Sequence, residues 1–498
     1  MNDTVQDLKE YYIGLSAWGE DLSNPKYKDK IVLGKPILEN LNKSKYFFNE
    51  GECLESIISI DAIKEKLYKD KEFYTMILLP ESWQDKWGRE LFDQLKRELE
   101  ETNHDVIIVP NLGEYSLENL EAKVYFDIIE NVSIRLGIDY NDMDINDILK
   151  ESMLKEIVVD CSRGANHVNI CMFEAAKRLG VRYSILKYSK DIDKYEKVKI
   201  KIYYANQKNG KNDFEFYELE APYKIFFSYP KLLKNNGKER QLIPEIKNED
   251  SGNLLDATYK EIKIYFNSFI IAPIFYFVYF DLDKLGNETP KNKIIENIPK
   301  CYKSILNKNK EKPISIKMCD FDICLSYGKL LLKLSEELNF NSYRDFKQID
   351  DPEIILIVLR LNHHDAAELD ENHVIKHHKK FIEKSIGSHI KEMIFAELSK
   401  FYKKFYFENN DKRRIPIATV NKSGKDVCES EVEFEKIVEN IKNNNINIDK
   451  RNFVAHAGLN KEIAVFYIGK DHKYIGYIDT KNFKIKEKIR KILENLDI

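Results

Sequence analysis

Short apolar runs alternate with helical patterns through the first 200 residues of the chain. Strand-like runs lie at 11–15, 73–79, 106–109, 156–160 and 182–188. Apolar positions recur at helical spacing in 87–102, in 117–136 and from about 166 to 179. Strands that alternate with helices form βαβ units, in which helices cover both faces of a parallel sheet. We therefore predict a Rossmann-like α/β domain at the N-terminus.

The pattern changes after a polar stretch at 232–252, which contains the turn-forming groups 235–237 and 248–252. Strand-like runs precede this stretch at 198–204, 214–220 and 224–229. Helical patterns follow it at 254–285, 291–307, 327–338, 352–361, 373–407 and 430–443. A strand-like pair at 462–468 and 474–478 and a helix at 482–493 close the chain.

These patterns predict an N-terminal domain at 1–230, a linker at 231–253 and a mainly α-helical region at 254–498. The range 340–430 is a candidate for a helical insertion. A chain of 498 residues is expected to form two or three domains.

Composition narrows the class of protein. Hydrophobic residues make up 43% and charged residues 33%, which is typical of globular proteins. The net charge of -4 indicates that any contact with nucleic acid is local. Seven scattered cysteines without a C-x-x-C pair favour a reducing, cytoplasmic setting without disulfides or a zinc ribbon. The longest apolar run, 266–280, contains Pro273 and is too short to span a membrane.

Polar and small residues follow three of the predicted strands, at the edge where ligands bind to parallel sheets. The candidate ligand-binding residues are Ser16, Trp18, Asn111, Gly113, Asp160, Ser162, Arg163, Gly164 and Asn166. The last five combine a hydroxyl, a guanidinium, an unhindered backbone and an amide at a predicted helix N-terminus, which suits phosphate. An ordinary strand-to-helix turn with a capping serine explains this loop equally well. The chain has neither a dinucleotide-binding nor a P-loop glycine motif.

The segment 450–459 carries the strongest candidate for catalysis. On a helix, Asn452 and His456 lie one turn apart on the same face, and Arg451 lies beside them. Histidine moves a proton near neutral pH, and arginine matches a phosphate with its planar fork of donors. The three residues suit cleavage of a phosphodiester without a metal. One helix presents only an edge, so we expect two copies to complete the site.

Five histidines gather at 363–378, and His373 and His377 have the spacing of metal ligands on a helix. The segment lacks an H-E-x-x-H pattern and is rich in competing charges. We therefore predict a solvated, charged helix pair and no metal site.

The string 451–459 resembles the signature of HEPN ribonuclease domains, in the form carried by CRISPR-associated ribonucleases of type III systems. Those proteins place a CRISPR-associated Rossmann-fold (CARF) sensor before the HEPN domain. Asp160, Ser162, Gly164 and Asn166 fill the places of the CARF motif, although its usual threonine is serine here. The loop with Ser16 and Trp18 is similar to the second ligand-facing loop of that family.

The resemblance implies a homodimer, with higher oligomers left open, that cleaves single-stranded RNA without a metal or other cofactor. A cyclic oligoadenylate, expected to be cyclic tetra-adenylate, would activate it. Arg451, Asn452 and His456 would catalyse attack of the 2′-hydroxyl on the adjacent phosphate, giving a 2′,3′-cyclic phosphate. The ring size of the activator, the preferred cleavage base and any breakdown of the activator by the CARF domain stay open.

Two other functions fit parts of the chain. A nucleotide-sensing transcription regulator would need a basic recognition helix, and 483–492 is basic enough to be considered. A toxin-type HEPN ribonuclease without a cyclic ligand would leave the large N-terminal sheet without a function.

Overall fold

The computed structural model divides the chain into two compact units. Unit 1 comprises Met1–Lys187, Glu196–Phe226 and Pro299–Ser326, and unit 2 comprises Tyr188–Tyr195, Phe227–Ile298 and Tyr327–Ile498. The structure describes residues 8–20, 22–24, 27, 30–48, 52–140, 143–187, 197–208, 212–221, 253–272, 276, 290–338, 344–348, 354–361, 417–420, 426–428, 439, 443, 448, 458, 464–468, 473–480 and 484–494.

Unit 1 is built on an eight-stranded sheet with the strand order β3-β2-β8-β7-β6-β1-β4-β5. The strands are β1 (Tyr11–Ala17), β2 (Ser44–Phe47), β3 (Cys53–Ser56), β4 (Glu72–Pro80), β5 (His104–Val109), β6 (Leu154–Asp160), β7 (Lys199–Gln207) and β8 (Asp213–Glu220). All neighbours from β7 to β5 are parallel, as are β2 and β8, whereas the pairs β7–β8 and β2–β3 are antiparallel. The prediction of a parallel α/β sheet is confirmed for the strands from β7 to β5, and the sheet as a whole is mostly parallel.

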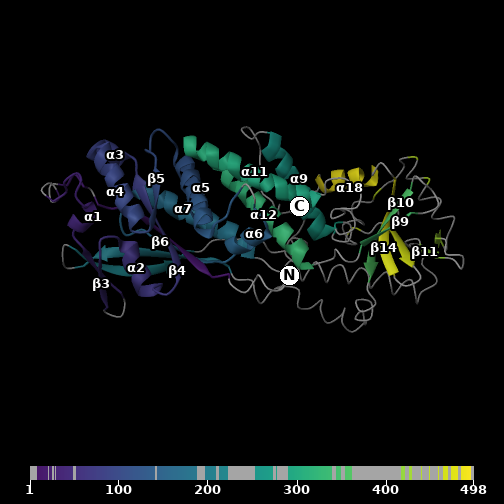
Figure 1. Ribbon diagram of the computed structural model, residues 1–498, viewed down its shortest axis with the longest axis horizontal. Coiled ribbons are helices and arrows are strands. Elements are labelled where there is room, and N and C mark those ends of the chain that lie inside the picture. Colours follow the sequence, from purple (N-terminus) through teal and green to yellow (C-terminus); the bar gives the residue numbers. More distant parts are fainter. Residues whose placement is uncertain are drawn as a thin grey trace, which may run out of the picture. The chain divides into compact units, whose positions relative to one another are not determined.

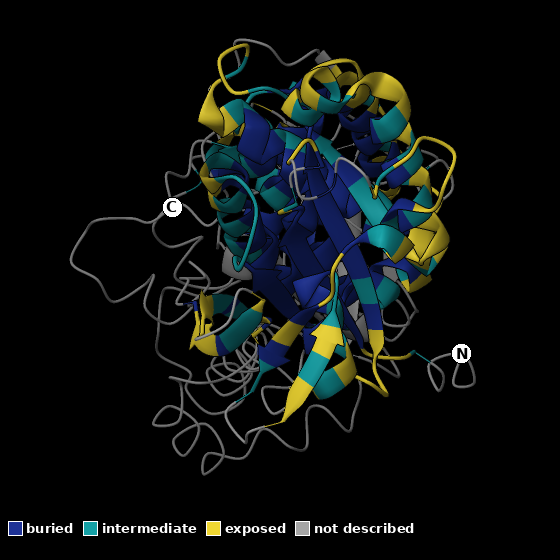
Figure 2. Ribbon diagram, turned by 90° about the vertical axis from the view of Figure 1, so that its left-hand side faces the viewer, coloured by how far each residue is buried: buried dark blue, intermediate teal, exposed yellow. Residues whose placement is uncertain are grey.

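Helices lie on both faces of this sheet (Figure 1). Those of the N-terminal segments are α1 (Ile37–Asn40), α2 (Ser59–Leu67), α3 (Ser82–Trp87), α4 (Arg89–Glu101), α5 (Leu117–Leu136), α6 (Ile145–Glu151) and α7 (Asn166–Lys187). Tyr12, Ile77 and Val158 belong to a core cluster with residues of α2 and α4. The alternate residues of the same strands face α5 and α7, so the central strands are buried on both sides (Figure 2).

The ends of α5 follow from its flanking residues. The Ser116 hydroxyl oxygen accepts a hydrogen bond from the backbone N–H of Asn119 at 3.2 Å, which caps the first turn. Gly137 ends the helix in the left-handed conformation, at φ 65°. The predicted bounds 117–136 are those of the helix.

One predicted strand of this region is wrong. The segment 182–188 was expected to be a fifth strand, but α7 continues to Lys187. Arg182 and the four residues after it are all buried, so this part of the helix has no solvent-facing stripe. An unbroken buried run carries no periodicity by which helix and strand are told apart.

In unit 2 the described residues combine helices with a six-stranded sheet of order β12-β11-β13-β14-β10-β9. These strands are β9 (Arg344–Gln348), β10 (Ile354–Leu361), β11 (Ile417–Val420), β12 (Asp426–Cys428), β13 (Ala464–Ile468) and β14 (Lys473–Thr480). The sequence predicted β13 and β14, which form an antiparallel pair. The helix expected at 352–361 is wrong, because its β-branched run, Ile354–Leu361, forms β10.

The helices α9 (Asn253–Ile271) and α18 (Lys484–Glu494) belong to the same unit. Within the predicted helix 254–285, α9 ends at Ile271, shortly before Pro273, and Tyr276 is helical again, with its backbone N–H bonded to the Ala272 carbonyl oxygen at 2.9 Å. The basic helix α18 packs against α9 and β14, burying Ile489 and Leu493. It is therefore part of the fold of this unit.

Two helices contribute residues to both units: α11 (Pro290–Glu311) and α12 (Lys317–Leu338). Residues 299–326, which the sequence assigned to the C-terminal region, group with the N-terminal sheet. The boundary in α11 falls at Pro299, which interrupts the backbone hydrogen bonds of the helix. The predicted linker at 231–253 and the segments at 224–229 and 373–407 lie almost entirely outside the described residues. Within the described part of the chain, no helix combines the length and the apolar character needed to cross a membrane.

Candidate ligand-binding site

Asp160 connects the loops at the carboxyl edge of the sheet. It ends β6 and lies opposite Ser16 of β1 in the strand register. Its Oδ2 accepts hydrogen bonds from the hydroxyls of Ser16, at 2.8 Å, and of Ser59 at the start of α2. Its Oδ1 accepts one from the backbone N–H of Ser162 at 3.0 Å. Asp160 is fully buried, so this carboxylate fixes the geometry of the edge.

Two glycines allow the loops after β1 and β6 to touch. A Cβ on Gly164, which has φ +91°, would lie 2.4 Å from the Cβ of Ala17. A Cβ on Gly19 would lie 2.3 Å from the Cβ of Arg163. Neither distance is tolerated between real carbon atoms, so both positions require glycine. The two loops therefore form one contact surface.

Arg163 is held by groups of the protein itself. Its guanidinium forms an ion pair with Glu20 and donates a hydrogen bond of 2.6 Å to the Ser44 hydroxyl. It also lies over the ring of Phe214, 4.9 Å from the centroid. The positive charge predicted to meet a phosphate is already neutralised by Glu20. Arg163 links the β6–α7 loop to the loop after β1, to β2 and to β8.

Three buried oxygen atoms near this edge have no hydrogen-bond partner among the described residues. They are Oγ of Ser162 and Oδ1 of Asn111 and Asn169. The Asn169 amide orientation is fixed, because its Nδ2 donates to the Arg163 carbonyl oxygen at 3.0 Å. Buried polar atoms without a partner are rare in folded proteins and mark places where water or a ligand bonds. Ser162 and Asn111 are among the predicted ligand-binding residues, and ligand binding by their free oxygens stays a prediction.

The remaining predicted residues divide into buried and exposed ones. Trp18 is only 3% exposed, and its indole N–H donates to the Glu20 carbonyl oxygen at 2.8 Å. It belongs to the core beneath the loop. Asn166 is exposed at the start of α7, where the free backbone N–H groups of a 22-residue helix favour an anion. Gly113, at φ +118°, shapes the exposed loop after β5.

The sequence did not indicate four residues that build this edge: Glu20, Ser44, Ser59 and Asn169. The first three are brought to Asp160 and Arg163 only by the fold, and no local pattern distinguishes them. Asn169 lies three residues after Asn166 in the first turn of α7, a position that helical spacing could have indicated.

The edge is better suited to binding than to catalysis. The Cys161 thiol lies in the β6–α7 loop, and burial, together with the charge of Asp160, raises its pKa to about 12. The thiol therefore stays protonated and is a weak nucleophile. Glycine-lined loops, spare oxygens and a helix N-terminus instead suit a ligand with both anionic and hydrogen-bond-donating groups.

The candidate catalytic residues Arg451, Asn452 and His456 lie outside the described residues, as does the histidine cluster at 363–378. Gly458, two positions after His456, is described. It is buried with φ +96°, and its carbonyl oxygen accepts a hydrogen bond of 3.1 Å from the Tyr477 hydroxyl of β14. Tyr477 is fully buried, and β14 is paired on both sides. The end of the motif is thus attached to the sheet of unit 2.

The mostly parallel sheet with its covering helices gives unit 1 a Rossmann-like fold. Residues 31–208 match the family described as the CARF domain of the CRISPR system endoribonuclease Csx1. The matched range runs from before β2 through β7 and includes the loop at 160–166. The match supports a CARF-containing CRISPR protein. Comparison with curated proteins found no significant match.

Proposed function

We propose that this protein is a metal-independent endoribonuclease of type III CRISPR defence, activated by a cyclic oligoadenylate. The observation that carries the proposal is the presence, in one chain, of a CARF domain matched over 31–208 and the string Arg451-Asn452-Phe453-Val454-Ala455-His456. The loops at the carboxyl edge of the unit 1 sheet support the proposed binding of the activator. The chemistry of arginine and histidine supports the proposed cleavage of RNA.

The sensor binds the ligand at the carboxyl edge of its sheet. The N-terminus of α7 receives a phosphate, and the free oxygens of Ser162 and Asn111 accept hydrogen bonds from amine or hydroxyl donors of the ligand. A cyclic tetra-adenylate carries phosphates, adenine amines and ribose hydroxyls, so it supplies both kinds of group. Two sensor copies enclose this symmetric ligand across an isologous interface.

The HEPN motifs of two chains form one composite groove. His456 acts as the base that accepts the proton of the attacking 2′-hydroxyl, or as the acid that donates a proton to the leaving 5′-oxygen. Arg451 binds the phosphate and offsets its charge in the transition state, and Asn452 orients the histidine or the phosphate. The products are a 2′,3′-cyclic phosphate and a 5′-hydroxyl. This work takes place in the cytoplasm, where the RNA and the activator are found.

The test is cleavage of a labelled single-stranded RNA in EDTA, with and without cyclic tetra-adenylate or cyclic hexa-adenylate. Ligand-dependent cleavage is expected, and His456→Ala should lower it by at least a hundredfold while ligand binding persists. His377→Ala is the matched control, because it removes a histidine from the cluster that has metal-ligand spacing. A strict requirement for a divalent ion, or full activity of His456→Ala, would reject the catalytic assignment.

The alternative of a DNA-binding regulator loses its main support. The basic helix α18 buries Ile489 and Leu493, and Arg490 is paired with Glu261 of α9. Adding duplex DNA to the same assay, with and without the cyclic ligand, tests whether the protein binds DNA as that alternative requires.

A further inference from the structure

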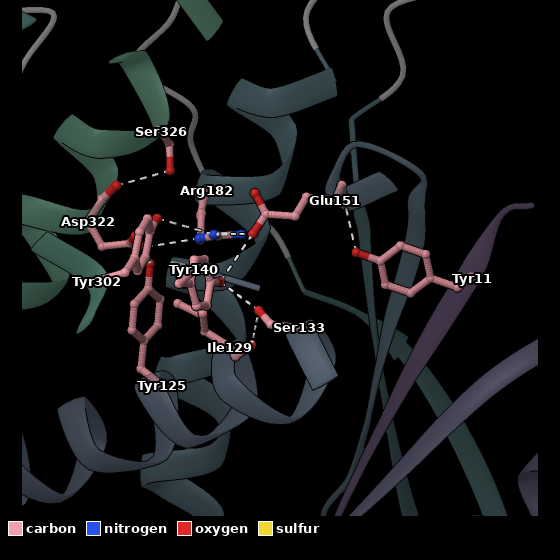
Figure 3. Close-up of polar contacts among 10 residues, drawn as sticks. All are labelled: Tyr11, Tyr125, Ile129, Ser133, Tyr140, Glu151, Arg182, Tyr302, Asp322 and Ser326. Atoms are coloured by element: carbon pink, nitrogen blue, oxygen red, sulfur yellow. Dashed lines mark hydrogen bonds and ion pairs between the residues drawn. The ribbon is translucent and has the colours of Figure 1, made fainter. Parts of the chain in front are cut away.

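A buried charge cluster lies in unit 1 (Figure 3). Its centre is Arg182 of α7, whose side chain is fully buried. The Arg182 guanidinium donates from Nε to Asp322 of α12 at 2.9 Å and from Nη2 to Glu151 of α6 at 2.7 Å. Asp322 and Glu151 are buried to the same degree. One cation therefore serves two carboxylates without contact with water.

Tyrosine hydroxyls complete the cluster. Tyr125 of α5 and Tyr302 of α11 both donate to the Asp322 carboxylate, and Tyr140 donates to Glu151 at 3.5 Å. Burial raises the pKa of all three hydroxyls well above 10, so they act as neutral donors. The rings of Tyr140 and Tyr302 are stacked, with centroids 4.5 Å apart. Two helices of the sensor, α5 and α7, thus meet α11 and α12 through directional polar bonds, and α6 joins the cluster through Glu151 and Arg182.

Stability alone does not account for such a cluster. Removing charges from water costs so much that buried ion pairs are often no better than apolar residues of the same size. Moreover, Nη1 of Arg182 has no hydrogen-bond partner among the described residues, so the cluster has an unused donor. The cluster instead fixes the position of α7 relative to the segment 299–326 of α11 and α12, because each hydrogen bond requires a defined position of the two helices that it joins.

The helices in this cluster connect two parts of the chain that the proposed function requires to communicate. The helix α7 begins at Asn166 of the ligand loop and carries Arg182 four to five turns later, about 24 Å along its axis. On the other side, α11 and α12 continue covalently into segments of unit 2. Asn309 bonds Asp127 at 2.8 Å and Arg178 bonds Asp320 at 3.1 Å, so the same segment is held at further points.

From this arrangement we infer that Arg182 and its partners Asp322 and Tyr302 transmit the ligand signal. A displacement of α7 caused by ligand at its first turn moves Arg182, and Arg182 moves the segment 299–326 with it. The inference rests on the proposed function, because it assumes that ligand binds at the α7 N-terminus. These three residues are positioning residues, since they touch neither ligand nor RNA.

The experiment compares two tyrosines whose rings are stacked on each other. Tyr302→Phe removes the hydroxyl that links α11 to Asp322 and Arg182, and Asp322→Asn removes the charge on α12. Tyr140→Phe is the matched control, since its hydroxyl bonds Ser133 and Glu151, which both belong to the sensor helices. Binding of cyclic tetra-adenylate and ligand-stimulated RNA cleavage are measured for each variant, with melting temperature as a check of folding.

For Tyr302→Phe and Asp322→Asn we expect binding within about threefold of the parent and at least a tenfold loss of stimulation, in the range of typical coupling energies. Tyr140→Phe should keep its stimulation. If Asp322→Asn and Tyr302→Phe are stimulated like the parent, the inference is overturned and the cluster serves packing alone.

Hydrogen exchange separates this inference from the proposed function. In the parent protein, ligand should change the exchange of amides in α11 and α12, and Asp322→Asn should abolish that change while it still binds ligand. This readout does not depend on RNA cleavage. A parent that binds the ligand without any change in α11 or α12 overturns the inference, whereas a parent that binds no cyclic oligoadenylate overturns the proposed function.

Discussion

At the N-terminal end of α7 the carboxylate of Asp160 is held by two hydroxyls and a backbone N–H. Further along the same helix, two carboxylates share the guanidinium of Arg182. The first arrangement uses neutral donors and leaves free oxygens nearby, so a solute can enter at modest cost. The second consists of charges without access to water, so its bonds can change only when helices move. One helix thus joins a region suited to binding with a region suited to transmission.

The largest expected difference between the two regions concerns their arginines. Arg182→Met leaves Glu151 and Asp322 buried without their cation and should lower the free energy of unfolding by about 3–5 kcal/mol. Arg163→Met breaks a partly exposed ion pair with Glu20 and should cost about 1–2 kcal/mol. Urea denaturation measures both. Equal losses would show that the two regions do not differ in this way.

A smaller effect is expected from Asp160→Asn. The amide places a donor where Asp160 now accepts three hydrogen bonds, so at least one of these is lost at a buried site. We expect a loss of about 2–3 kcal/mol in unfolding free energy and weaker binding of cyclic oligoadenylate. Asp85→Asn, an exposed residue of α3, is the control. Unchanged binding by a folded Asp160→Asn protein would contradict the role of this edge.

The smallest effect concerns Asp127 of α5, where α11 contacts the sensor. Burial raises the pKa of this carboxyl from 3.8 to about 6, although Lys123 opposes the shift. Because the native state binds the proton more tightly than the unfolded chain does, this group favours folding increasingly as the pH falls from about 6 toward 4. The size of the effect is on the order of 2 kcal/mol.

The measurement is the difference in unfolding free energy between the parent and Asp127→Asn from pH 7.5 to 4.5. This difference should change with pH in the stated direction, because the amide does not titrate. Parallel curves for the two proteins would show that the Asp127 carboxyl does not titrate in this range.

The sheet of unit 1 was predictable because its strands are short, apolar and bounded by turn residues. The position of Asp160 at the end of β6 and of Asn166 at the start of α7 followed from the same pattern. The strands β2 and β3 were missed, because each is only four residues long; β2 has two buried residues and β3 has none. The helix end at 182–187 was mistaken for a strand because burial on all sides removes periodicity.

The site was predictable only where its residues are neighbours in sequence. Asp160, Ser162, Gly164 and Asn166 lie within seven positions, but Ser59 reaches Asp160 across 101 residues. Two partners of Arg182 are separated even further, because Tyr302 lies 120 and Asp322 lies 140 residues away. Such distances leave no trace in local spacing. The ion pair between Arg163 and Glu20 is likewise visible only in the folded chain, and it changes the role predicted for Arg163.

The grouping of 299–326 with the N-terminal sheet means that the sensor is not one continuous stretch of sequence. A fragment that ends near residue 226 would lack Tyr302 and Asp322 and would leave the buried Arg182 without two of its partners. During synthesis, the sensor can complete its core only after the ribosome has passed residue 326. An engineered sensor therefore has to include this helical segment or replace it with a helix pair that carries equivalent partners for Arg182.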